Sequence, residues 1–328
     1  YITNIYMKII GSGSYGCVIK PAVPCKKKKI KKNKVSKISR VGEQNIEYET
    51  SKKLFSYGKN KKIKVQDYLC LIDDVCEPDI TKLNATLKKK CSIISEKKKS
   101  KKLTSLMMDD CGIILNKMIK NNGCEQKDFE DIIINLLKGL EILHKNKLVH
   151  GDIKENNILV KNKKAKLIDF GGSVDITKYD LVNFLNTLII TGTYVAPELS
   201  FLFLIVNNTS NHYEYLVNYD RYKMNELIYE DSGYGYDKIR NQRKEKTDIC
   251  NFFDSLEDKK KYEKFLKDFK THIYKTDVYS LGKTLEYLVL DYKLKINKKI
   301  KNLIEKMTHL DFKKRISLKK CIDYMKKK

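Results

Sequence analysis

The order of sequence patterns predicts an α+β protein with two lobes, a small β-rich lobe followed by a larger helical one. Patterns typical of strands dominate the first hundred residues, and patterns typical of amphipathic helices dominate the remainder. A chain of 328 residues with 41% hydrophobic residues is long enough to bury a sizeable core. Four prolines and fifteen glycines argue against a low-complexity or disordered chain. The sequence has no internal repeat.

The predicted elements of the small lobe begin with two strands joined by a glycine-rich turn. Residues 5–20, IYMKIIGSGSYGCVIK, place an apolar stretch on each side of that turn, and residues 34–40, KVSKISR, predict a third short strand. A short amphipathic helix is expected over 43–55, where apolar residues are spaced among charged ones. Residues 103–112, LTSLMMDDCG, predict an apolar strand that ends in an acidic turn.

Helices dominate the rest of the chain. The strongest helical pattern, DFEDIIINLLKGLEILHKN at 128–146, has its apolar residues on one face, and Asp128 is the expected N-cap. KAKLIDFGG at 164–172 predicts a strand and a turn. A second helix is expected over 276–290, and the chain from about 297 onward is predicted to be helical and basic.

The net charge of +26 comes mostly from lysine, including the runs KKKKIKKNK at 26–34 and KKKSKK at 97–102. Such runs attract nucleic acid or an anionic membrane when they gather on one surface. They also occur as solvated loops, and an AT-rich genome would account for them together with the many Ile, Asn and Tyr residues. The runs alone favour the solvated interpretation.

The nine cysteines predict reduced thiols in a cytoplasmic compartment. Their number is odd, they form no C-x-x-C pair, and five histidines supply no zinc spacing. No secretory signal is recognised, so the default is a reducing compartment. The longest apolar run, FLFLIV at 201–206, is far shorter than the roughly 20 residues that a membrane-spanning helix needs, so no transmembrane segment is expected.

The turn GSGSYGCV at 11–18 has the form G-x-G-x-x-G-x-V, which is typical of a phosphate-binding loop. Glycines between two strands let backbone N–H groups approach phosphate oxygens without a side-chain clash. A dinucleotide site uses the same glycines, but there the last glycine opens a helix. Here Gly16 leads into a strand, which argues against that alternative. The loop residues expected to contact a nucleotide are Gly11, Ser12, Gly13, Ser14, Tyr15, Gly16, Cys17 and Val18.

From this loop onward the sequence resembles the eukaryotic-type protein kinase family. After the glycine loop, the matching motifs are VSKI (35–38), HGDIKENN (150–157), DFG (169–171), TGTYVAPE (191–198) and TDVYSLG (276–282). Their order makes the match specific over about 5–200 and 271–325. The resemblance implies the two-lobed protein kinase fold as a single domain, with an N-lobe of about 1–109 and a C-lobe of about 110–328. It also implies ATP and Mg²⁺, with Mn²⁺ as an alternative metal.

The resemblance gives separate roles to the polar residues of HGDIKENN. Asp152 matches the catalytic base that accepts the proton of the substrate hydroxyl, and Lys154 matches the lysine that steadies the transferring γ-phosphoryl group. Asn157 matches a metal ligand, and Asp169 of the DFG motif would hold Mg²⁺ against the β- and γ-phosphates. Phosphoryl transfer needs such groups because it depends on positioning and on charge neutralisation.

Lys37 lies where the family's strand lysine binds the α- and β-phosphates. Its helix partner is expected to be Glu47, with Glu49 as the alternative. Glu47 is preferred because Leu54, seven residues later, then falls on the buried face of the helix.

The resemblance also implies an adenine pocket. Val18 and Leu159 would enclose the base from two sides, and Met108 would be the gatekeeper. The stretch from Asp109 to Cys111 would form the hinge, whose backbone hydrogen-bonds adenine.

Two motifs imply long-range anchors in the C-lobe. Glu198 is expected to pair with Arg315, and Asp277 to anchor the backbone of the catalytic loop. Glu198 and Asp277 are 79 residues apart, where the family needs on the order of a dozen, so an insertion is expected at about 201–270. It either recognises a partner or is a solvated elaboration. A second expansion, at about 57–102, is expected in the small lobe.

The implied activity is a serine/threonine protein kinase. A small-molecule kinase of the aminoglycoside or choline type also carries H-G-D-x-x-x-x-N, but such relatives generally lack the lysine two residues after the aspartate and the A-P-E segment. Lys154, with Thr191 or Thr193, favours serine or threonine over tyrosine as the acceptor. A pseudokinase scaffold or nucleic-acid-binding protein is the alternative from another class, although every residue that the chemistry requires is present.

Gly151 departs from the family, because most regulated members have an arginine there that clamps a phosphorylated activation loop. We therefore expect activity that does not depend on phosphorylation of Thr187, Thr191 or Thr193. The residues of the motifs are similar to those of divergent kinases of large cytoplasmic DNA viruses. This similarity would imply action in a host cytoplasm or on virion proteins. An AT-rich parasite or protist is the alternative source.

Overall fold

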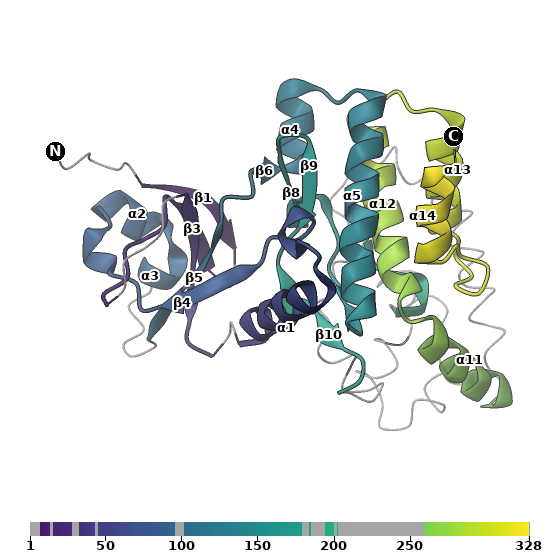
Figure 1. The fold of residues 1–328 in the computed structure, drawn as a ribbon, viewed down its shortest axis with the longest axis horizontal. Helices are drawn as coiled ribbons and strands as arrows, with labels where there is room; N and C mark the ends of the chain where they lie inside the picture. Colours follow the sequence, from purple (N-terminus) through teal and green to yellow (C-terminus); the bar gives the residue numbers. More distant parts are fainter. Residues whose placement is uncertain are drawn as a thin grey trace, which may run out of the picture. The chain divides into compact units, whose positions relative to one another are not determined.

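The computed structural model describes residues 7–13, 16–27, 33–42, 45–95, 102–178, 184, 194–199, 202 and 259–327. The chain divides into two compact units, which are taken in turn below (Figure 1). The first unit consists of Tyr1–Gly112 and Lys166–Gly171, and the second of Ile113–Ala165 and Gly172–Lys328. Strands dominate the first unit and helices the second, as the sequence predicts.

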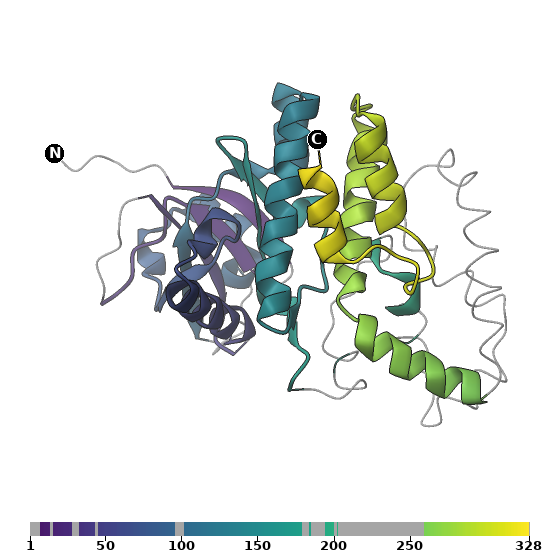
Figure 2. The same ribbon diagram turned by 45° about the vertical axis from the view of Figure 1, so that its right-hand side comes forward.

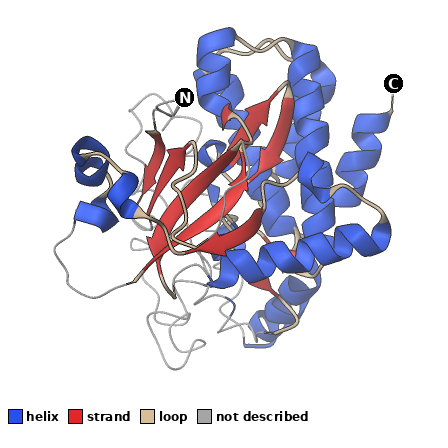
Figure 3. Ribbon diagram, turned by 60° about the vertical axis from the view of Figure 1, so that its left-hand side comes forward, coloured by secondary structure: helices blue, strands red, loops and turns tan. Residues whose placement is uncertain are grey.

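The first unit is built on a five-stranded antiparallel sheet in the order β1-β2-β3-β5-β4 (Figure 3). Its strands are β1 (Lys8–Gly13), β2 (Gly16–Lys20), β3 (Lys34–Arg40), β4 (Ile72–Cys76) and β5 (Leu103–Asp109). The three strand regions predicted from the sequence are confirmed. The sequence IDDVC of β4 was not predicted to be a strand, because its two adjacent acids interrupt the apolar pattern that marks one.

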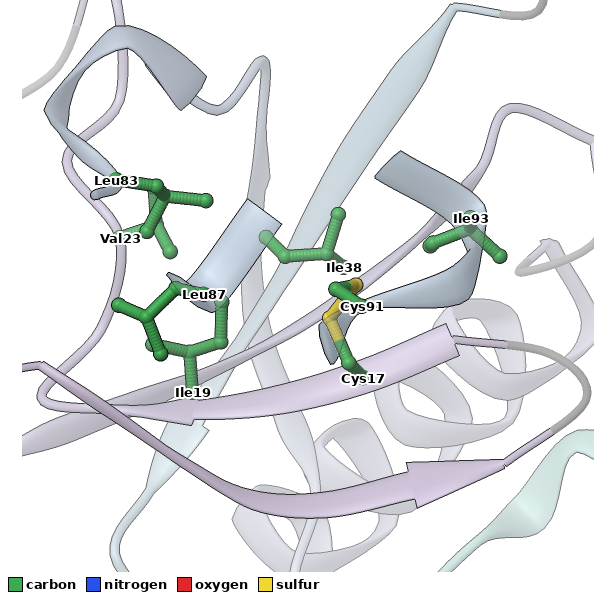
Figure 4. Packing of buried hydrophobic residues seen from close by; sticks show 8 residues of the cluster. All are labelled: Cys17, Ile19, Val23, Ile38, Leu83, Leu87, Cys91 and Ile93. Atoms are coloured by element: carbon green, nitrogen blue, oxygen red, sulfur yellow. A yellow bond between two sulfur atoms is a disulfide. The ribbon is translucent and has the colours of Figure 1, made fainter. Parts of the chain in front are cut away.

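Opposite faces of this sheet carry different helices. Neighbouring residues of a strand point to opposite faces. Lys37 of β3 contacts the helix α1 (Asn45–Lys61), whereas the next residue, Ile38, packs in an apolar cluster with α2 (Ala85–Lys90) and α3 (Ser92–Ser95). Figure 4 shows this cluster, which consists of Cys17, Ile19, Val23, Ile38, Leu83, Leu87, Cys91 and Ile93. The helix α1 confirms the predicted helix at 43–55 and extends further, to Lys61.

Three disulfides cross-link the first unit: Cys17–Cys91, Cys25–Cys76 and Cys70–Cys111. The prediction of reduced thiols is wrong for these six cysteines. The paired residues are 74, 51 and 41 positions apart, so only the folded sheet and helices bring them together. Cys124 and Cys321 of the second unit form no disulfide, and Cys250 lies outside the described residues.

The second unit is mostly helical. Its helices are α4 (Leu115–Asn122), α5 (Gln126–Lys145), α11 (Lys259–His272), α12 (Lys275–Asp291), α13 (Lys298–Met307) and α14 (Leu318–Lys326). The core is formed by the apolar face of α5, and α14 lies along this helix (Figures 1 and 2). The predicted helices over 128–146, 276–290 and the C-terminal region are confirmed. Among the described residues, no helix is long and apolar enough to cross a membrane.

The start of α5 corrects one expectation. Glu125 is the N-cap, and its side chain makes no capping hydrogen bond, so the prediction of Asp128 as the N-cap is wrong. Because the helix starts earlier, Asp128 lies in its first turn, where a negative charge is favourable near the helix N-terminus. Its carboxylate lies 3.0 Å from the ammonium of Lys163.

Short strands of the second unit carry the segments with the predicted chemistry. β7 (Leu148–Val149) pairs with β10 (Val174–Asp175), and β6 (Ile113–Ile114) pairs with β8 (Ile158–Lys161). The stretch between β7 and β8 contains the motif HGDIKENN and ends in the short 3-10 turn Glu155–Asn157. A further strand, β9 (Lys164–Leu167), begins in this unit and continues into the first.

Candidate active site

Lys37 is the centre of the candidate site in the first unit. In the sheet it lies opposite Val18 of β2, so the two residues predicted to meet a nucleotide are neighbours on adjacent strands. The Lys37 Nζ atom lies 2.8 Å from Glu47 Oε2 and 3.0 Å from Asp169 Oδ1. The alternative partner, Glu49, pairs instead with Lys52 on the exposed side of α1. The structure thus brings together Lys37, Glu47 and Asp169.

The charge of Lys37 is maintained by its two partners. Burial alone would lower the pKa of Lys37, but the carboxylates of Glu47 and Asp169 outweigh burial and raise that pKa above its ordinary value. The ammonium group therefore stays protonated at any physiological pH. A permanent positive charge at this position suits a contact with phosphate oxygens.

Asp169 has a backbone conformation that is uncommon for a residue with a side chain. Its φ is 63°, in the left-handed region that aspartate tolerates better than most residues. The carboxylate is 44% exposed, although one of its oxygens contacts Lys37. A conformation of this kind persists only where the surroundings hold it, and such positions are concentrated at functional sites.

The glycine loop joins β1 to β2, and Gly16 at its end has a specific steric role. Gly16 has a φ of 149°, and a Cβ atom placed there would lie 2.0 Å from the carbonyl oxygen of Ile38. Gly11 pairs with Val18 across the two strands, and Ser12 and Gly13 complete β1. Ser14 and Tyr15 lie outside the described residues.

Cys17 belongs to the predicted nucleotide-binding set, but its side chain faces away from Lys37. It is fully buried in the apolar cluster with α2 and α3, and it forms the disulfide with Cys91 (Figure 4). Val18, which is half-buried, faces the side of the sheet that carries Lys37. Any contact between Cys17 and a nucleotide would therefore have to come from the Cys17 backbone.

The predicted hinge follows β5 directly. Met108 lies between Val35 and Ile72 in the sheet, and the hinge residues begin immediately after it. The Asp109 Oδ1 atom lies 2.7 Å from Lys34 Nζ. Asp110 Oδ2 lies 2.8 Å from Lys20 Nζ.

Two further contacts fix the backbone of the hinge. The Asp110 N–H donates to the carbonyl of Asn33 at 3.2 Å. Cys111 is buried and bonded to Cys70. The hinge is thus connected to Asn33, the residue before β3, by a hydrogen bond and to the segment before β4 by a covalent bond.

The catalytic motif of the second unit gathers three of its predicted residues around one carboxylate oxygen. Lys154 Nζ lies 2.9 Å from Asp152 Oδ2, and the Asn157 side-chain amide donates to the same oxygen at 2.9 Å. That amide also donates to the backbone carbonyl of Asp152 at 2.8 Å. Asp152 and Asn157 are buried, so their positions are well defined by these contacts. Leu159 follows on β8 and is half-buried.

Asp277 anchors the backbone of this motif, as the resemblance implies. Its carboxylate accepts hydrogen bonds from the N–H groups of His150 at 2.9 Å and Gly151 at 3.0 Å. Burial alone would raise the pKa of Asp277, but the contact with His144 and the charge of the neighbouring histidines lower it below the ordinary value. The Nε2 atom of His144 lies 2.9 Å from Asp277 Oδ2, a contact that the sequence interpretation missed. In the sequence, His144 is an isolated histidine at the end of a helical pattern, and nothing there indicates its partner.

Glu198 and Arg315 form the predicted ion pair. Arg315 Nη1 lies 2.5 Å from Glu198 Oε1, and Arg315 Nη2 lies 3.0 Å from Glu198 Oε2. Both side chains are fully buried, and the guanidinium also donates to the carbonyls of His309, Lys275 and Leu310. The pair therefore fixes the end of the A-P-E segment to the chain that precedes α14.

The sequence interpretation also missed a contact beside the catalytic motif. The Tyr194 hydroxyl donates to Glu155 Oε2 at 2.6 Å, and the Tyr194 ring packs edge-on against Tyr287. Glu155 stood in the motif without an assigned role. Tyr194 thus connects the segment before A-P-E to the catalytic motif within the second unit.

Asn157 of the second unit and Asp169 of the first unit each carry an oxygen donor of the kind that hard divalent cations bind. An amide oxygen and a carboxylate are the ligands that Mg²⁺ and Mn²⁺ prefer. Within the described part of the chain, no group of three or more His, Cys, Asp or Glu residues is arranged to hold a metal by itself.

Several predicted features lie outside the described residues. These are Thr187, Thr191, Thr193, the lysine-rich stretches 28–32 and 96–101, and most of the expected insertion at 201–270. Within that insertion the structure describes Leu202 and the helix α11. Phe265 and Phe269 of this helix pack against Phe312.

The fold and the two groups of polar residues define a protein kinase. The family model for the protein kinase domain matches residues 5–325, so the chain belongs to this family and has its two-lobed fold. Protein kinase domains in general use ATP and a divalent metal.

Two curated relatives share parts of the chain. Probable serine/threonine-protein kinase fhkE of Dictyostelium discoideum is 25% identical over 186 residues, which cover 54% of this chain and 23% of that protein. Misshapen-like kinase 1 of Rattus norvegicus is 37% identical over 98 residues, which cover 28% of this chain and 7% of that protein. The matched regions thus span less than a quarter of the length of these relatives.

Proposed function

We propose that this chain is a serine/threonine protein kinase that transfers the γ-phosphate of ATP to hydroxyl groups of proteins. The observation that carries the proposal is the buried Asp152 carboxylate, which is held by Lys154 and Asn157 on one oxygen and whose segment is anchored by Asp277. This arrangement holds the Asp152 carboxylate in one orientation. It suits a base that accepts the proton of a substrate hydroxyl.

The proposed roles of the other residues follow from their contacts. Lys154 places a positive charge beside Asp152, where it would steady the charge that develops on the transferring phosphoryl group. Lys37, held by Glu47, would bind the α- and β-phosphates. Asn157 and Asp169 would hold Mg²⁺, or Mn²⁺, which when bound neutralises phosphate charge.

The remaining nucleotide contacts are proposed from the resemblance. The glycine loop, Val18 and Leu159 would enclose the nucleotide, and the hinge after Met108 would receive adenine. Serine and threonine are proposed as acceptors because Lys154 follows Asp152 by two residues, and because one relative carries the words serine/threonine-protein kinase in its name.

Phosphate transfer to casein or to a basic protein, with radiolabelled ATP and Mg²⁺, tests the proposal. Asp152→Asn is expected to lower kcat by about 10² to 10⁴, the range typical of a lost general base. Asp131→Asn is the matched control, since Asp131 is an exposed aspartate of α5 paired with Lys127. Transfer that persists in the Asp152 variant would contradict the assigned base.

The same assay separates the alternatives. A parent protein that binds ATP but phosphorylates no protein would favour a small-molecule kinase if it phosphorylated an aminoglycoside or choline. It would favour a pseudokinase scaffold if it phosphorylated neither. Phosphoamino-acid analysis of the labelled product decides between serine or threonine and tyrosine as the acceptor.

We further propose that the whole chain is one kinase domain, with lobes of about 1–109 and 110–328 and an insertion at about 201–270.

A viral source, and action in a host cytoplasm or on virion proteins, are proposed from the similarity of the motifs. The expected cytoplasmic location relied on reduced thiols, and the three disulfides remove that support. Contact of the lysine runs with nucleic acid or an anionic membrane is likewise a proposal.

A further inference from the structure

The disulfide Cys70–Cys111 joins the predicted hinge to the segment that precedes β4. The Cα atoms of the two cysteines are 6.2 Å apart, and both residues are about 95% buried. The Cys70 sulfur also lies 3.7 Å from the carbonyl oxygen of Asp109, the first residue of the hinge. At this end of the sheet, the last residue pair between β4 and β5 is Ile72 with Met108. The disulfide therefore joins the two chain segments beyond the end of their strand pairing.

The segment that carries Cys70 is also bonded to the strand that leads to Asp169. The Cys70 N–H donates to the Leu167 carbonyl at 2.9 Å, and the Leu167 N–H donates to the Tyr68 carbonyl at 3.1 Å. Leu69 and Leu167 form a parallel bridge and are fully buried. Leu167 is only two residues before Asp169, so the Cys70 segment sets the position of the backbone that presents this carboxylate.

A third connection leads from the same segment to α1. The Ile72 N–H donates to the Ser51 hydroxyl at 3.1 Å, and that hydroxyl donates to the Glu47 carbonyl at 2.9 Å. Ser51 is fully buried. The segment 68–72 is therefore joined to the hinge by a covalent bond and to Leu167, two residues before Asp169, by backbone hydrogen bonds. It is connected to the Glu47 carbonyl through the Ser51 hydroxyl.

We propose that Cys70 and Cys111 are positioning residues for nucleotide binding, and that their disulfide holds the hinge in register with the Lys37–Glu47–Asp169 group. This inference rests on the proposed function, because it assumes that the hinge receives adenine. Adenine and the phosphates are bound by different parts of the first unit, so a nucleotide binds well only when these parts keep a fixed separation. The disulfide supplies that constraint before the nucleotide arrives, and pre-organisation of this kind raises affinity.

The matched control is the disulfide Cys25–Cys76 of the same unit. It closes a loop of similar length, 51 residues against 41, so its removal is expected to cost similar stability if loop closure dominates. Cys76 lies at the far end of β4 from Ile72, and its disulfide makes no connection to the hinge or to Leu167. A general loss of stability would therefore raise the KM for ATP in both double variants. A positioning role would raise it only in the variant that lacks Cys70–Cys111.

The experiment compares Cys70→Ala/Cys111→Ala with Cys25→Ala/Cys76→Ala in the full chain. We expect the first variant to raise the KM for ATP about ten-fold, with kcat and the KM for the protein substrate within about two-fold of the parent. The control is expected to keep the parent's KM for ATP. Equal KM values for ATP in the two variants would overturn the inference.

Hydrogen exchange supplies a readout that does not depend on activity. In the Cys70–Cys111 variant, amide exchange is expected to rise both at 103–112 and at 166–170, and the control should show neither rise. If the double variant does not fold, the single variant Cys70→Ala replaces it, with Cys25→Ala as its control.

Failure of the proposed function is distinguishable from failure of the inference. A parent protein that neither binds ATP nor transfers phosphate would refute the proposed function, while the exchange data would still decide whether the disulfide couples the two segments. Iodoacetamide labelling of the protein, unfolded in urea without a reductant so that buried sulfurs become accessible, provides a direct check. Labelling of Cys70 and Cys111 before any reduction would overturn the inference, and their protection would support it.

Discussion

The two units of this kinase stabilise their functional residues by different means. In the first unit, three disulfides connect the sheet to its flanking helices and loops, and the functional charges of Lys37, Glu47 and Asp169 contact each other directly. In the second unit, buried polar side chains from distant helices fix the backbone, as Asp277 and Arg315 do. The described cysteines of that unit are unpaired, and burial raises the pKa of Cys321 to about 12.

The two units also pack their apolar residues differently. In the second unit, long helices such as α5 and α12 bury apolar residues along their length. In the first unit, an apolar cluster packs one face of the sheet against α2 and α3, and the disulfide Cys17–Cys91 lies within that cluster. The comparison therefore predicts that single polar changes destabilise the second unit strongly, and that changes in the first unit mainly affect nucleotide binding.

Arg315→Ala should produce the largest loss of stability. It leaves the Glu198 carboxylate, 1% exposed, without its charged partner, and a broken buried pair typically costs about 3 to 5 kcal/mol. Urea denaturation followed by circular dichroism measures this change. The control Lys314→Ala removes an adjacent side chain that is 73% exposed, and its stability should match the parent. Equal midpoints for the two variants would contradict the comparison.

Glu47→Gln should have the next largest effect, on catalysis rather than on folding. Glutamine keeps the shape of the side chain but not its charge, so Lys37 loses one of its two charged partners. Hydrogen bonds to charged groups contribute about 1.5 to 3 kcal/mol, so kcat/KM for ATP is expected to fall about ten-fold to a hundred-fold. Glu49→Gln, which removes only the exposed contact with Lys52, serves as the control. If both variants lose activity equally, Glu47 is not the specific partner of Lys37.

The smallest expected effect concerns phosphorylation. Gly151, with a φ of 80°, has no side chain to bind a phosphorylated loop, and its N–H is committed to Asp277. Phosphatase treatment of the purified protein should therefore change kcat by less than about two-fold, because the arginine that makes such regulation possible is missing. Protein isolated with Thr187 replaced by alanine should behave in the same way. A large loss of activity in either case would show that another residue performs the role of that arginine.

Much of the site could be predicted because its residues are close in the sequence. Asp152, Lys154 and Asn157 fall within six positions, and the structure places all three around one carboxylate. Glu47 was preferred over Glu49 because of helical spacing to Leu54, which is fully buried, and the contact with Lys37 agrees with that preference. Local periodicity is therefore informative where one helix or one turn forms the site.

The remainder depends on contacts between distant segments. Cys70 and Cys111 are 41 positions apart, and no spacing rule identifies their pairing, so no sequence pattern indicates that the hinge is covalently held. The strand β4 was missed because Asp73 and Asp74 hide its apolar pattern. The cap of α5 was misassigned because several polar residues precede the apolar stripe, and only the backbone shows which of them the helix uses.

The proposed function assigns the catalytic base to Asp152, and it assigns nucleotide binding to residues other than Asp152. The most direct test measures ATP affinity and phosphate transfer together for Asp152→Asn, by calorimetric titration with ATP and Mg²⁺ and by radiolabel transfer from the same preparation. The account predicts an ATP dissociation constant within about two-fold of the parent and a loss of transfer of at least about 10². Transfer at the parental rate with normal ATP affinity would contradict it.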